Sequence, residues 1–272
     1  MSIFGKWTER SPQLASEFSS ARPFQHVVIP EFFSEEVART IVADFPSPKD
    51  SGLTWHHYDN PIEQKFALDD FSGLPRISEI FDSLQADETV RLLTKITGIK
   101  DLMADPLLHG AGLHAYPSGG KLDVHLDYCI HPISGDERRC NLIVYMNPDW
   151  KPEYNGELEL WNESLTEKKS IIAPSFNTAV LFKTNDMSYH GLPRPLRCPQ
   201  GEYRKSLAIY YVSPRTDGAI PRFRAEYHPT PEQKVTGNAK LEKLYSIRKY
   251  RRIEPEDLRD WPSWRTDGGD FW

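Results

Sequence analysis

The chain has 272 residues, of which 26% are charged and 12% are aromatic, and its formal net charge is −6. This length allows one large domain with a buried core, and the aromatic content excludes a largely disordered chain. The acidic balance disfavours a nucleic acid as the main partner. The three cysteines lack CxxC spacing, which argues against a disulfide framework and against a thiolate zinc site. No apolar run approaches the ~20 residues of a membrane span, and the N-terminus lacks a signal-peptide core, so we expect a cytoplasmic protein with no membrane partner.

The first 106 residues predict a region of one strand and three helices that supports the rest of the chain. A β-branched run predicts the strand, and apolar stripes at three- and four-residue spacing predict the helices. Ser34 is a candidate N-cap, and Gly98 is a candidate helix stop. The residues before the strand are expected to form a loose arm or a short helix, and residues 55–58 lie in a loop without a clear pattern. The predicted strand covers residues 24–29, and the predicted helices cover residues 35–45, 74–84 and 86–96.

From residue 107 to residue 215, short apolar runs alternate with turn sequences rich in Gly, Pro, Asn and Ser. Many short strands with few helices between them indicate an antiparallel sandwich or barrel. The sequence therefore predicts a mainly β fold with flanking helices. The predicted strands cover residues 107–116, 122–127, 140–146, 157–161, 170–172, 179–183 and 206–212.

Residues 216–272 form a C-terminal extension of this single functional domain. Leu241, Leu244 and Tyr245 have the spacing of one helical face, and basic residues surround them. One interpretation is a helix that docks by its apolar side and exposes a solvated basic face. The other is a basic surface for an acidic partner.

A His-x-Asp triplet provides the first candidate site. His125 and Asp127 are two residues apart in a predicted strand, so their side chains share one face of the sheet. His190 follows after several predicted strands, where a jelly roll can return the chain beside the first strand. Two histidines and one carboxylate on one face form the facial triad of non-haem Fe(II) oxygenases, which leaves coordination positions open. The alternative is a chance triplet, because exposed strands often carry polar residues at alternate positions.

A second pair of polar residues opens the last predicted strand. Arg204 and Ser206 are again two residues apart, and therefore on one face. A guanidinium fork binds a carboxylate through two hydrogen bonds, and a neighbouring hydroxyl can add a third. This pair can hold the distal carboxylate of 2-oxoglutarate, although a lone arginine at a strand start is more often a surface charge.

Five segments, in order and spacing, resemble the prolyl 4-hydroxylase-like branch of the Fe(II)/2-oxoglutarate-dependent dioxygenase superfamily. The resemblance covers roughly residues 107–213. The N-terminal helices match the family only in type, and the C-terminal extension is not placed by it. The segments are YPSGGKLDVHLD (116–127), RRCNLIVYMNPDW (138–150), NGELELW (155–161), YHG (189–191) and RKSLAIYY (204–211).

The resemblance implies a double-stranded β-helix, which is a distorted jelly roll, supported by N-terminal α-helices. It implies Fe(II), with 2-oxoglutarate and O2 as co-substrates and ascorbate as a supporting reductant. The implied reaction hydroxylates a C–H bond of an organic substrate and releases succinate and CO2. The assigned residues are His125, Asp127 and His190 for iron, Arg204 for the distal carboxylate of 2-oxoglutarate, and Ser206, Tyr145 and Tyr116 for the rest of the co-substrate pocket.

The sequence leaves the substrate and the oligomeric state open. A side chain of a protein or peptide and a small metabolite are both compatible with the family, whereas the acidic pI disfavours a nucleic acid. Two alternatives from other classes are a non-catalytic metal-binding jelly-roll module and a Zn(II) hydrolase with a His2Asp site. Each substrate candidate belongs to a residue type that, at such a position, is more often a packing residue than a recognition residue. These candidates are Trp55, His57, Tyr58, Tyr128, Asn141 and Trp161.

Overall fold

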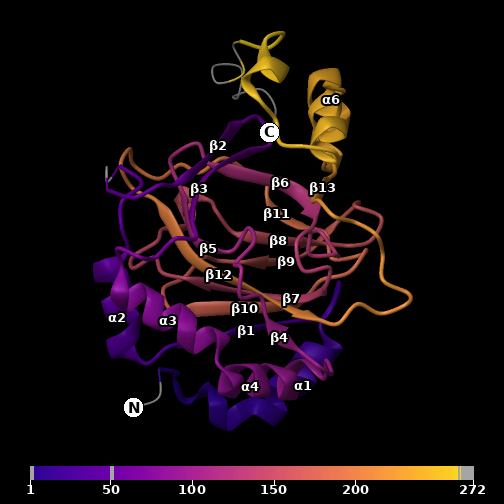
Figure 1. Ribbon diagram of the computed structural model, residues 1–272. Helices are drawn as coiled ribbons and strands as arrows, with labels where there is room; N and C mark the ends of the chain where they lie inside the picture. The colour runs from indigo at the N-terminus through magenta and orange to yellow at the C-terminus, as the bar shows by residue number, and fades with distance from the viewer. Residues whose placement is uncertain (1–2, 50–51, 263, 265–272) are drawn as a thin grey trace.

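The computed structural model describes residues 3–49, 52–262 and 264, and Figure 1 shows the arrangement of their helices and strands. None of the helices in these ranges combines the length and the apolar character that a membrane crossing requires. The helices are α1 (Ser11–Ser20), α2 (Glu35–Asp44), α3 (Pro75–Gln85), α4 (Asp87–Thr97), α5 (Pro231–Thr236) and α6 (Ala239–Arg248), with short 3-10 turns η1 (Lys6–Arg10), η2 (Pro152–Tyr154) and η3 (Pro255–Leu258).

The strands join into one antiparallel sheet, whose main path runs β1-β10-β7-β12-β5-β3-β6-β11-β8-β9. Three short or peripheral strands extend this path: β13 pairs with β6, β2 with β3, and β4 with β12. The strands are β1 (His26–Ile29), β2 (His56–Asn60), β3 (Glu63–Leu68), β4 (Met103–Ala104), β5 (Gly112–Tyr116), β6 (Lys121–Leu126), β7 (Glu137–Tyr145), β8 (Leu158–Trp161), β9 (Lys168–Ile172), β10 (Thr178–Lys183), β11 (His190–Leu192), β12 (Arg204–Ser213) and β13 (Glu226–Tyr227).

The sheet curls so that strands far apart in its order face each other. Val180 and Phe182 of β10 pack against Leu158 and Leu160 of β8, although six strands separate β10 from β8 along the path. Leu181, between the two β10 residues, points the other way and joins the cluster that contains the helices. This alternation follows from the two-residue period of a strand. It places one apolar layer inside the curl and a second one beneath the helices.

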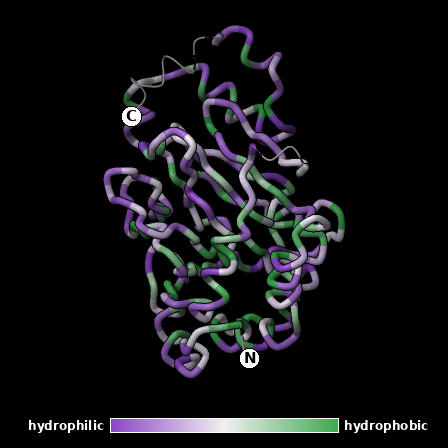
Figure 2. The backbone as a smooth tube through the Cα atoms, turned by 90° about the vertical axis from the view of Figure 1, so that its left-hand side faces the viewer, coloured by the Kyte–Doolittle hydropathy of each residue, from purple (hydrophilic) through white to green (hydrophobic). Residues whose placement is uncertain are grey.

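The helices α1 to α4 gather on one side of the curled sheet (Figure 1). Leu14 and Phe18 of α1, Ile77 and Phe81 of α3, and Leu93 of α4 are buried in the layer that they share with the strands. Figure 2 shows hydrophobic stretches within this packed body and hydrophilic stretches along many loops. The predicted mainly β fold, a jelly roll supported by N-terminal helices, is therefore confirmed.

Several predicted boundaries shift for local reasons. The strand predicted from residue 107 begins at Gly112, because the Asp105 carboxylate accepts hydrogen bonds from the backbone N–H groups of Leu107 and His109 and makes a turn there. Ser34 does cap α2, with its hydroxyl accepting from the Val37 N–H at 3.4 Å. The N-terminal arm is a 3-10 turn followed by the packed helix α1 rather than a loose segment.

Two features were not predicted as elements. The segment read as an unpatterned loop around residues 55–58 forms β2, which pairs with β3 as a hairpin. Asn60 closes that hairpin by accepting hydrogen bonds from the N–H groups of Ile62 and Glu63. The short strand β13 brings the C-terminal extension beside the His125 strand, with Tyr227 opposite His125.

The C-terminal extension docks by the apolar face of α6, as one of the two interpretations predicted. Leu241, Leu244 and Tyr245 pack against Ile62 and Tyr227. Polar contacts reinforce this packing, because the Tyr245 hydroxyl donates to the buried Asp123 carboxylate of β6 at 2.7 Å. The extension is thereby fixed to the strand that carries the His-x-Asp triplet.

Candidate active site

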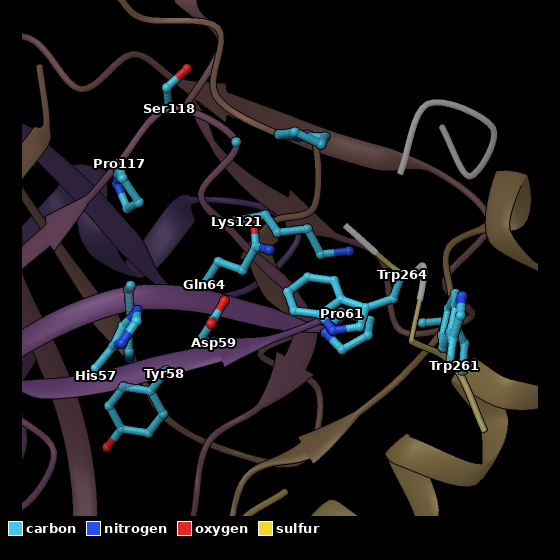
Figure 3. A pocket seen from close by; sticks show the side chains of 14 residues that line it. His57, Tyr58, Asp59, Pro61, Gln64, Pro117, Ser118, Lys121, Trp261 and Trp264 are labelled. Atoms are coloured by element: carbon cyan, nitrogen blue, oxygen red, sulfur yellow. The ribbon is translucent and has the colours of Figure 1, made fainter. Parts of the chain in front are cut away.

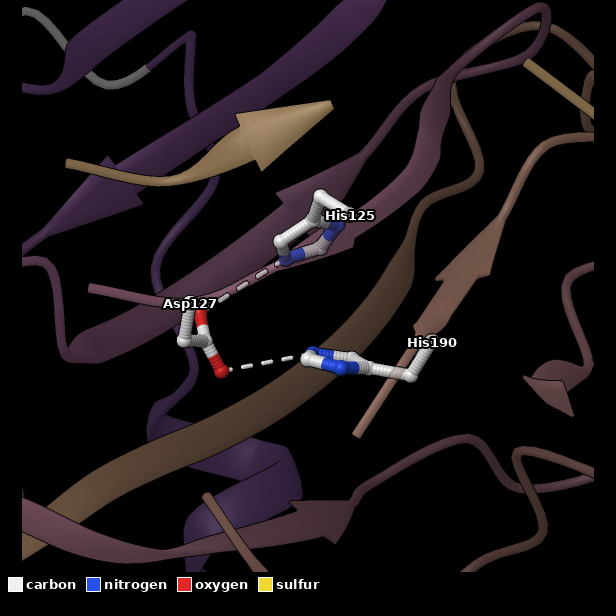
Figure 4. Close-up of side chains that lie close together, drawn as sticks. All are labelled: His125, Asp127 and His190. Carbon is white, nitrogen blue, oxygen red and sulfur yellow. Dashed lines mark ion pairs between the residues drawn. The ribbon is translucent and has the colours of Figure 1, made fainter. Parts of the chain in front are cut away.

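Three side chains converge where β6 and β11 pair. His125 lies in β6, Asp127 follows the end of that strand, and His190 opens β11 directly opposite His125. The Asp127 carboxylate lies 3.6 Å from His125 Nε2 and 3.4 Å from His190 Nε2 (Figure 4). All three residues are buried, and one potential ligand atom of each lies within 4.8 Å of the other two. This arrangement can hold one metal ion from one side.

Backbone carbonyls fix the orientation of both imidazole rings. His125 Nδ1 lies 2.9 Å from the carbonyl oxygen of Asp123, and His190 Nδ1 lies 2.8 Å from that of Ser188. A carbonyl only accepts, so each Nδ1 carries the proton and each Nε2 presents its lone pair to the centre of the group. Gly191 permits this close approach of the strands, because a Cβ there would lie only 2.9 Å from the Leu122 carbonyl oxygen.

Asp127 is held by two further side chains. Asn141 donates from Nδ2 to Asp127 Oδ2 at 2.7 Å, and Arg138 lies 3.2 Å from the same oxygen. Arg138 also donates from Nε to Asn141 Oδ1 at 2.8 Å, so the three groups form a closed network. Burial alone would raise the pKa of Asp127, but the Arg138 guanidinium holds it well below its ordinary value. The carboxylate is therefore ionised and ready to bind a cation.

His190 is suited to neutral ligation. Its burial, together with the neighbouring His125, lowers the pKa of His190 to about 4. The ring is therefore uncharged at neutral pH, as a metal ligand must be.

Arg204 is the first residue of β12, the strand that lies between β5 and β7 in the sheet. Its side chain faces the same cavity as the metal group. Its guanidinium carbon lies 4.7 Å from the ring centre of Tyr145 and 5.3 Å from that of Tyr116. Ser206 is buried two residues later on β12 and pairs in register with Tyr145. The Tyr145 hydroxyl is buried and has no hydrogen-bond partner among the described residues. A buried cation beside an unpaired hydroxyl fits a carboxylate ligand.

Gly156 allows Arg204 to reach this position. Arg204 donates from Nε to the Gly156 carbonyl oxygen at 2.6 Å, which orients the guanidinium. A Cβ on Gly156 would lie 3.0 Å from Arg204 Cδ and 2.6 Å from Leu196 Cδ2, and its φ of +93° also favours glycine. The turn at residues 155–157 therefore helps to orient Arg204, because its glycine leaves space for the arginine side chain and its carbonyl accepts the hydrogen bond.

A single cavity of about 520 Å³ contains both groups. His125, Asp127, His190, Arg204, Ser206 and Tyr116 all line it. Its volume is in the range of small-molecule sites, and it is large enough for a co-substrate with part of a substrate beside it.

The substrate candidates predicted from the sequence divide into two sets. Tyr58, Tyr128 and Asn141 line the cavity, although Asn141 is engaged by Asp127. His57 stacks on Phe66 and lines a separate pocket of about 380 Å³ (Figure 3).

The other two candidates are not among the residues that line the cavity. Trp161 is buried and donates from Nε1 to Glu159 Oε2 at 3.1 Å. Trp55 packs on Phe66 at the edge of the core. Trp161 also lines a separate pocket of about 540 Å³, so the structure places neither residue in the cavity that holds the metal group.

The cavity also holds residues that the sequence did not single out. His114 of β5 is buried, and its Nε2 has no hydrogen-bond partner among the described residues. Burial and the nearby Lys65 ammonium lower the pKa of His114 well below its ordinary value, so the ring is neutral. The signal available in the sequence was its position two residues before Tyr116, on the same face of the strand.

Lys65, Glu63 and Arg248 form a second group in the cavity. Lys65 Nζ lies 3.2 Å from Glu63 Oε1, and Arg248 Nη2 lies 3.7 Å from Glu63 Oε2. Burial would raise the pKa of Glu63, but the Lys65 and Arg248 cations lower it below its ordinary value. Arg248 had been predicted to belong to a solvated basic face, but only 14% of its side chain is exposed.

Residues 111–212 match the family model of the 2OG-Fe(II) oxygenase superfamily. This part of the chain is therefore similar to members of that superfamily. The match contains both halves of the site, the His125/Asp127/His190 group and Arg204. No curated protein matches the chain significantly in sequence.

Solved structures support the same fold. A prolyl hydroxylase from Trichoplax adhaerens, in complex with a hypoxia inducible factor peptide fragment, is 18% identical with a TM-score of 0.57 over 77% of this chain and 94% of its own. A prolyl 4-hydroxylase from Phytophthora capsici is 17% identical with a TM-score of 0.55, and the match covers 99% of this chain and 83% of that one. A prolyl 4-hydroxylase from Pseudomonas putida is 18% identical with a TM-score of 0.50, and the match covers 75% of this chain and 100% of that one.

The family and the fold indicate a dioxygenase that uses Fe(II) and 2-oxoglutarate. The residues present fit both groups. The metal group is buried, ionised at Asp127 and neutral at His190, and the second group offers a buried guanidinium beside the unpartnered Tyr145 hydroxyl.

Proposed function

We propose that this protein is a 2-oxoglutarate-dependent hydroxylase in which His125, Asp127 and His190 hold Fe(II) and Arg204 binds the distal carboxylate of 2-oxoglutarate. The observation that carries the proposal is that one cavity brings a buried three-residue metal group and a buried arginine together. A hydrolytic zinc site would leave Arg204, Tyr145 and Tyr116 without a purpose. A non-catalytic module would have no reason to keep a carboxylate pocket beside its metal.

Fe(II) and 2-oxoglutarate, when bound together, would supply an O2-dependent oxidative decarboxylation, in which one oxygen atom enters succinate, CO2 leaves, and the other oxygen atom hydroxylates a C–H bond. The chain supplies position and charge. Asn141 and Arg138 hold the Asp127 carboxylate, and backbone carbonyls aim the Nε2 atoms of His125 and His190. Ser206 and Tyr145 add hydroxyl groups beside Arg204 for the carboxylate.

The buried walls keep bulk water away from the reacting centre. Asp127 itself favours hydroxylation over halogenation, because a carboxylate takes the position that a halide would need.

Two substrate classes fit the family, a peptide side chain and a small metabolite. The Trichoplax adhaerens relative, by its description, binds a peptide fragment. The cavity of about 520 Å³ in this chain is partly walled by the C-terminal extension, through Tyr227 and Arg248. Those walls favour a compact substrate, and Tyr58 and Tyr128 are the aromatic residues placed to contact it.

The test is succinate formation from 2-oxoglutarate by purified protein supplied with Fe(II), ascorbate and O2. Slow turnover without a primary substrate is expected for this chemistry, so no substrate has to be guessed. The same protein, reconstituted anaerobically, should bind Fe(II) and 2-oxoglutarate together. Failure of joint binding would rule out the proposal. Hydrolytic activity with Zn(II) and no effect of 2-oxoglutarate would establish the hydrolase instead.

A further inference from the structure

One wall of the cavity comes from outside residues 111–212, the part that matches the family model, and holds three cations and one carboxylate. We call it the basic wall: Glu63 and Lys65 of β3, Arg248 at the end of α6, and Arg252 four residues later. These residues come from two segments that are far apart in the sequence. The wall exists only because the C-terminal extension docks beside the β2–β3 hairpin.

The charges within the basic wall do not cancel. Lys65 and Arg248 share the single carboxylate of Glu63, at 3.2 and 3.7 Å, and Glu63 Oε2 has no hydrogen-bond partner among the described residues. Arg252 donates from Nη2 to the neutral hydroxyl of Tyr58 at 3.1 Å. With three cations and one carboxylate, the basic wall carries a net charge of +2.

Other groups in the cavity do not supply the missing negative charge. The Asp69 carboxylate contacts the His56 ring, at 3.1 Å from Nε2, and among the described residues it forms no ion pair with a cation of the basic wall, while Asp127 is matched by Arg138 and committed to the metal group. Arg204 adds a further cation, which the co-substrate carboxylate would neutralise. Arg252 is exposed, but the Lys65 and Arg248 side chains are only 11% and 14% exposed, and a sheltered excess of cations is costly unless an anion accompanies it. The basic wall therefore has an excess of positive charge that an anionic ligand can neutralise.

The wall lies close to the metal group. The ring of Tyr227 stacks on His125, with 5.2 Å between ring centres, and the guanidinium carbon of Arg248 lies 5.6 Å from the centre of the same Tyr227 ring. One aromatic ring therefore separates Arg248 from a metal-binding imidazole.

The cations are held in place by packing. Tyr245 and Gln233 both donate hydrogen bonds to the Asp123 carboxylate, at 2.7 and 3.2 Å. Leu244 is buried in the same apolar cluster as Ile62, which lies in the turn between β2 and β3. The guanidinium of Arg252 lies 5.1 Å from the ring centre of Tyr58, and Lys65 Nζ lies at the same distance from that ring. Fixed cations lose little entropy when they bind an anion.

We propose that the basic wall binds a carboxylate or phosphate group of the primary substrate, and that Arg248 and Arg252 select substrates that bear it. The inference rests on the proposed oxygenase function, because it assigns the anion to the molecule being oxidised. Arginine forks suit both kinds of oxyanion, which they bind through paired hydrogen bonds. The substrate is then a compact acid rather than a neutral molecule.

Calorimetry on protein saturated with Zn(II) and 2-oxoglutarate tests the anion site, since Zn(II) replaces Fe(II) without redox chemistry and 2-oxoglutarate occupies Arg204. The probes are isobutyrate, its neutral amide isobutyramide, and inorganic phosphate. We expect isobutyrate or phosphate to bind about tenfold or more tightly than the amide. The probe that binds identifies a carboxylate or a phosphate as the group recognised.

The variants are Arg248→Ala, Arg252→Ala and, as a milder change, Arg252→Gln. Each should weaken anion binding about tenfold or more. Arg259→Ala is the matched control, because Arg259 is exposed and does not line the cavity. Thermal melting shows whether each variant is folded. Anion binding that is equal to amide binding, or that survives in folded Arg252→Gln and Arg248→Ala proteins, overturns the inference.

Succinate formation by the wild-type protein separates this inference from the proposed function. Succinate formed without selective anion binding would keep the oxygenase and remove the acidic substrate. Selective anion binding without joint Fe(II) and 2-oxoglutarate binding would remove the oxygenase, and with it the claim that the anion belongs to an oxidised substrate.

Discussion

The two ends of the cavity are built in different ways. The metal end uses neighbouring jelly-roll strands, and its single carboxylate, Asp127, is paired with Arg138 at 3.2 Å. The basic wall uses a hairpin and a C-terminal helix, and its cations outnumber Glu63. The first end is electrostatically complete without a substrate, and the second is not. We infer that the reaction type is set by the core strands and the substrate choice by the segments added around them.

The strongest test of the metal end is Asp127→Ala. We expect iron binding to be lost and succinate formation to fall to background, because only two imidazoles, and no carboxylate, remain in the group to hold a dication. Arg138 also loses its counterion, so the free energy of unfolding should fall by about 3–5 kcal/mol, the usual cost of breaking a buried pair. Metal content after anaerobic reconstitution is the primary measurement.

The exposed Asp70 gives a control of the same residue type, because its carboxylate accepts a local hydrogen bond from the Ser72 backbone N–H. Asp70→Ala should bind iron and form succinate like the wild type. An Asp127→Ala protein that retains one iron per chain would show that the metal is held elsewhere.

Arg204→Ala tests the co-substrate half of the same end. Loss of a charge-assisted, bidentate contact should raise the concentration of 2-oxoglutarate needed for half-maximal succinate formation about 10–100-fold. Iron binding should change much less, because Arg204 does not contact the metal group. Arg197→Ala, at an exposed position, is the control. An unchanged 2-oxoglutarate requirement would mean that another cation, such as Lys65, holds the distal carboxylate.

The difference between the two ends also explains what the sequence could predict. His125 and Asp127, like Arg204 and Ser206, are spaced by two residues, and a strand turns that spacing into a shared face. The return of His190 beside His125 followed from the jelly-roll pattern, and the register of β11 against β6 agrees with it.

The basic wall had no such local pattern. Lys65 faces the cavity because β3 pairs with β5, and Arg248 faces it because Tyr245 and Leu244 dock α6 on β6 and the hairpin. Neither contact has a signature within a short window of residues. The hairpin itself was missed because β2 is polar and only partly buried, so its residues lack the apolar alternation that identifies a strand.

Asn141→Leu tests whether Asn141 belongs to the metal end or contacts the substrate. The sequence suggested a substrate contact, whereas the structure places the Asn141 amide 2.7 Å from Asp127 Oδ2. Removing a residue that orients a metal ligand typically weakens metal affinity about 10–100-fold. We therefore expect weaker Fe(II) binding in the absence of any substrate, measured by anaerobic titration. Unchanged metal affinity with a raised substrate requirement would restore the substrate role.

The smallest expected effect tests how the two ends are joined. In Tyr245→Phe, the Asp123 carboxylate loses a hydrogen bond at 2.7 Å but keeps Gln233 at 3.2 Å and Lys121 at 2.8 Å. The free energy of unfolding should fall by about 1–3 kcal/mol, as measured by urea denaturation. Tyr250→Phe, at a position that is 80% exposed, should change it by little.

The same variant should affect the two ends unequally. Tyr245 belongs to the extension that carries Arg248, whereas His125 is also held in β6 by its pairing with β11. Anion binding should therefore weaken more than Fe(II) binding does. If Fe(II) binding weakens as much as anion binding, the docking of α6 supports the metal strand itself, and the two ends are one unit rather than a core with an added wall.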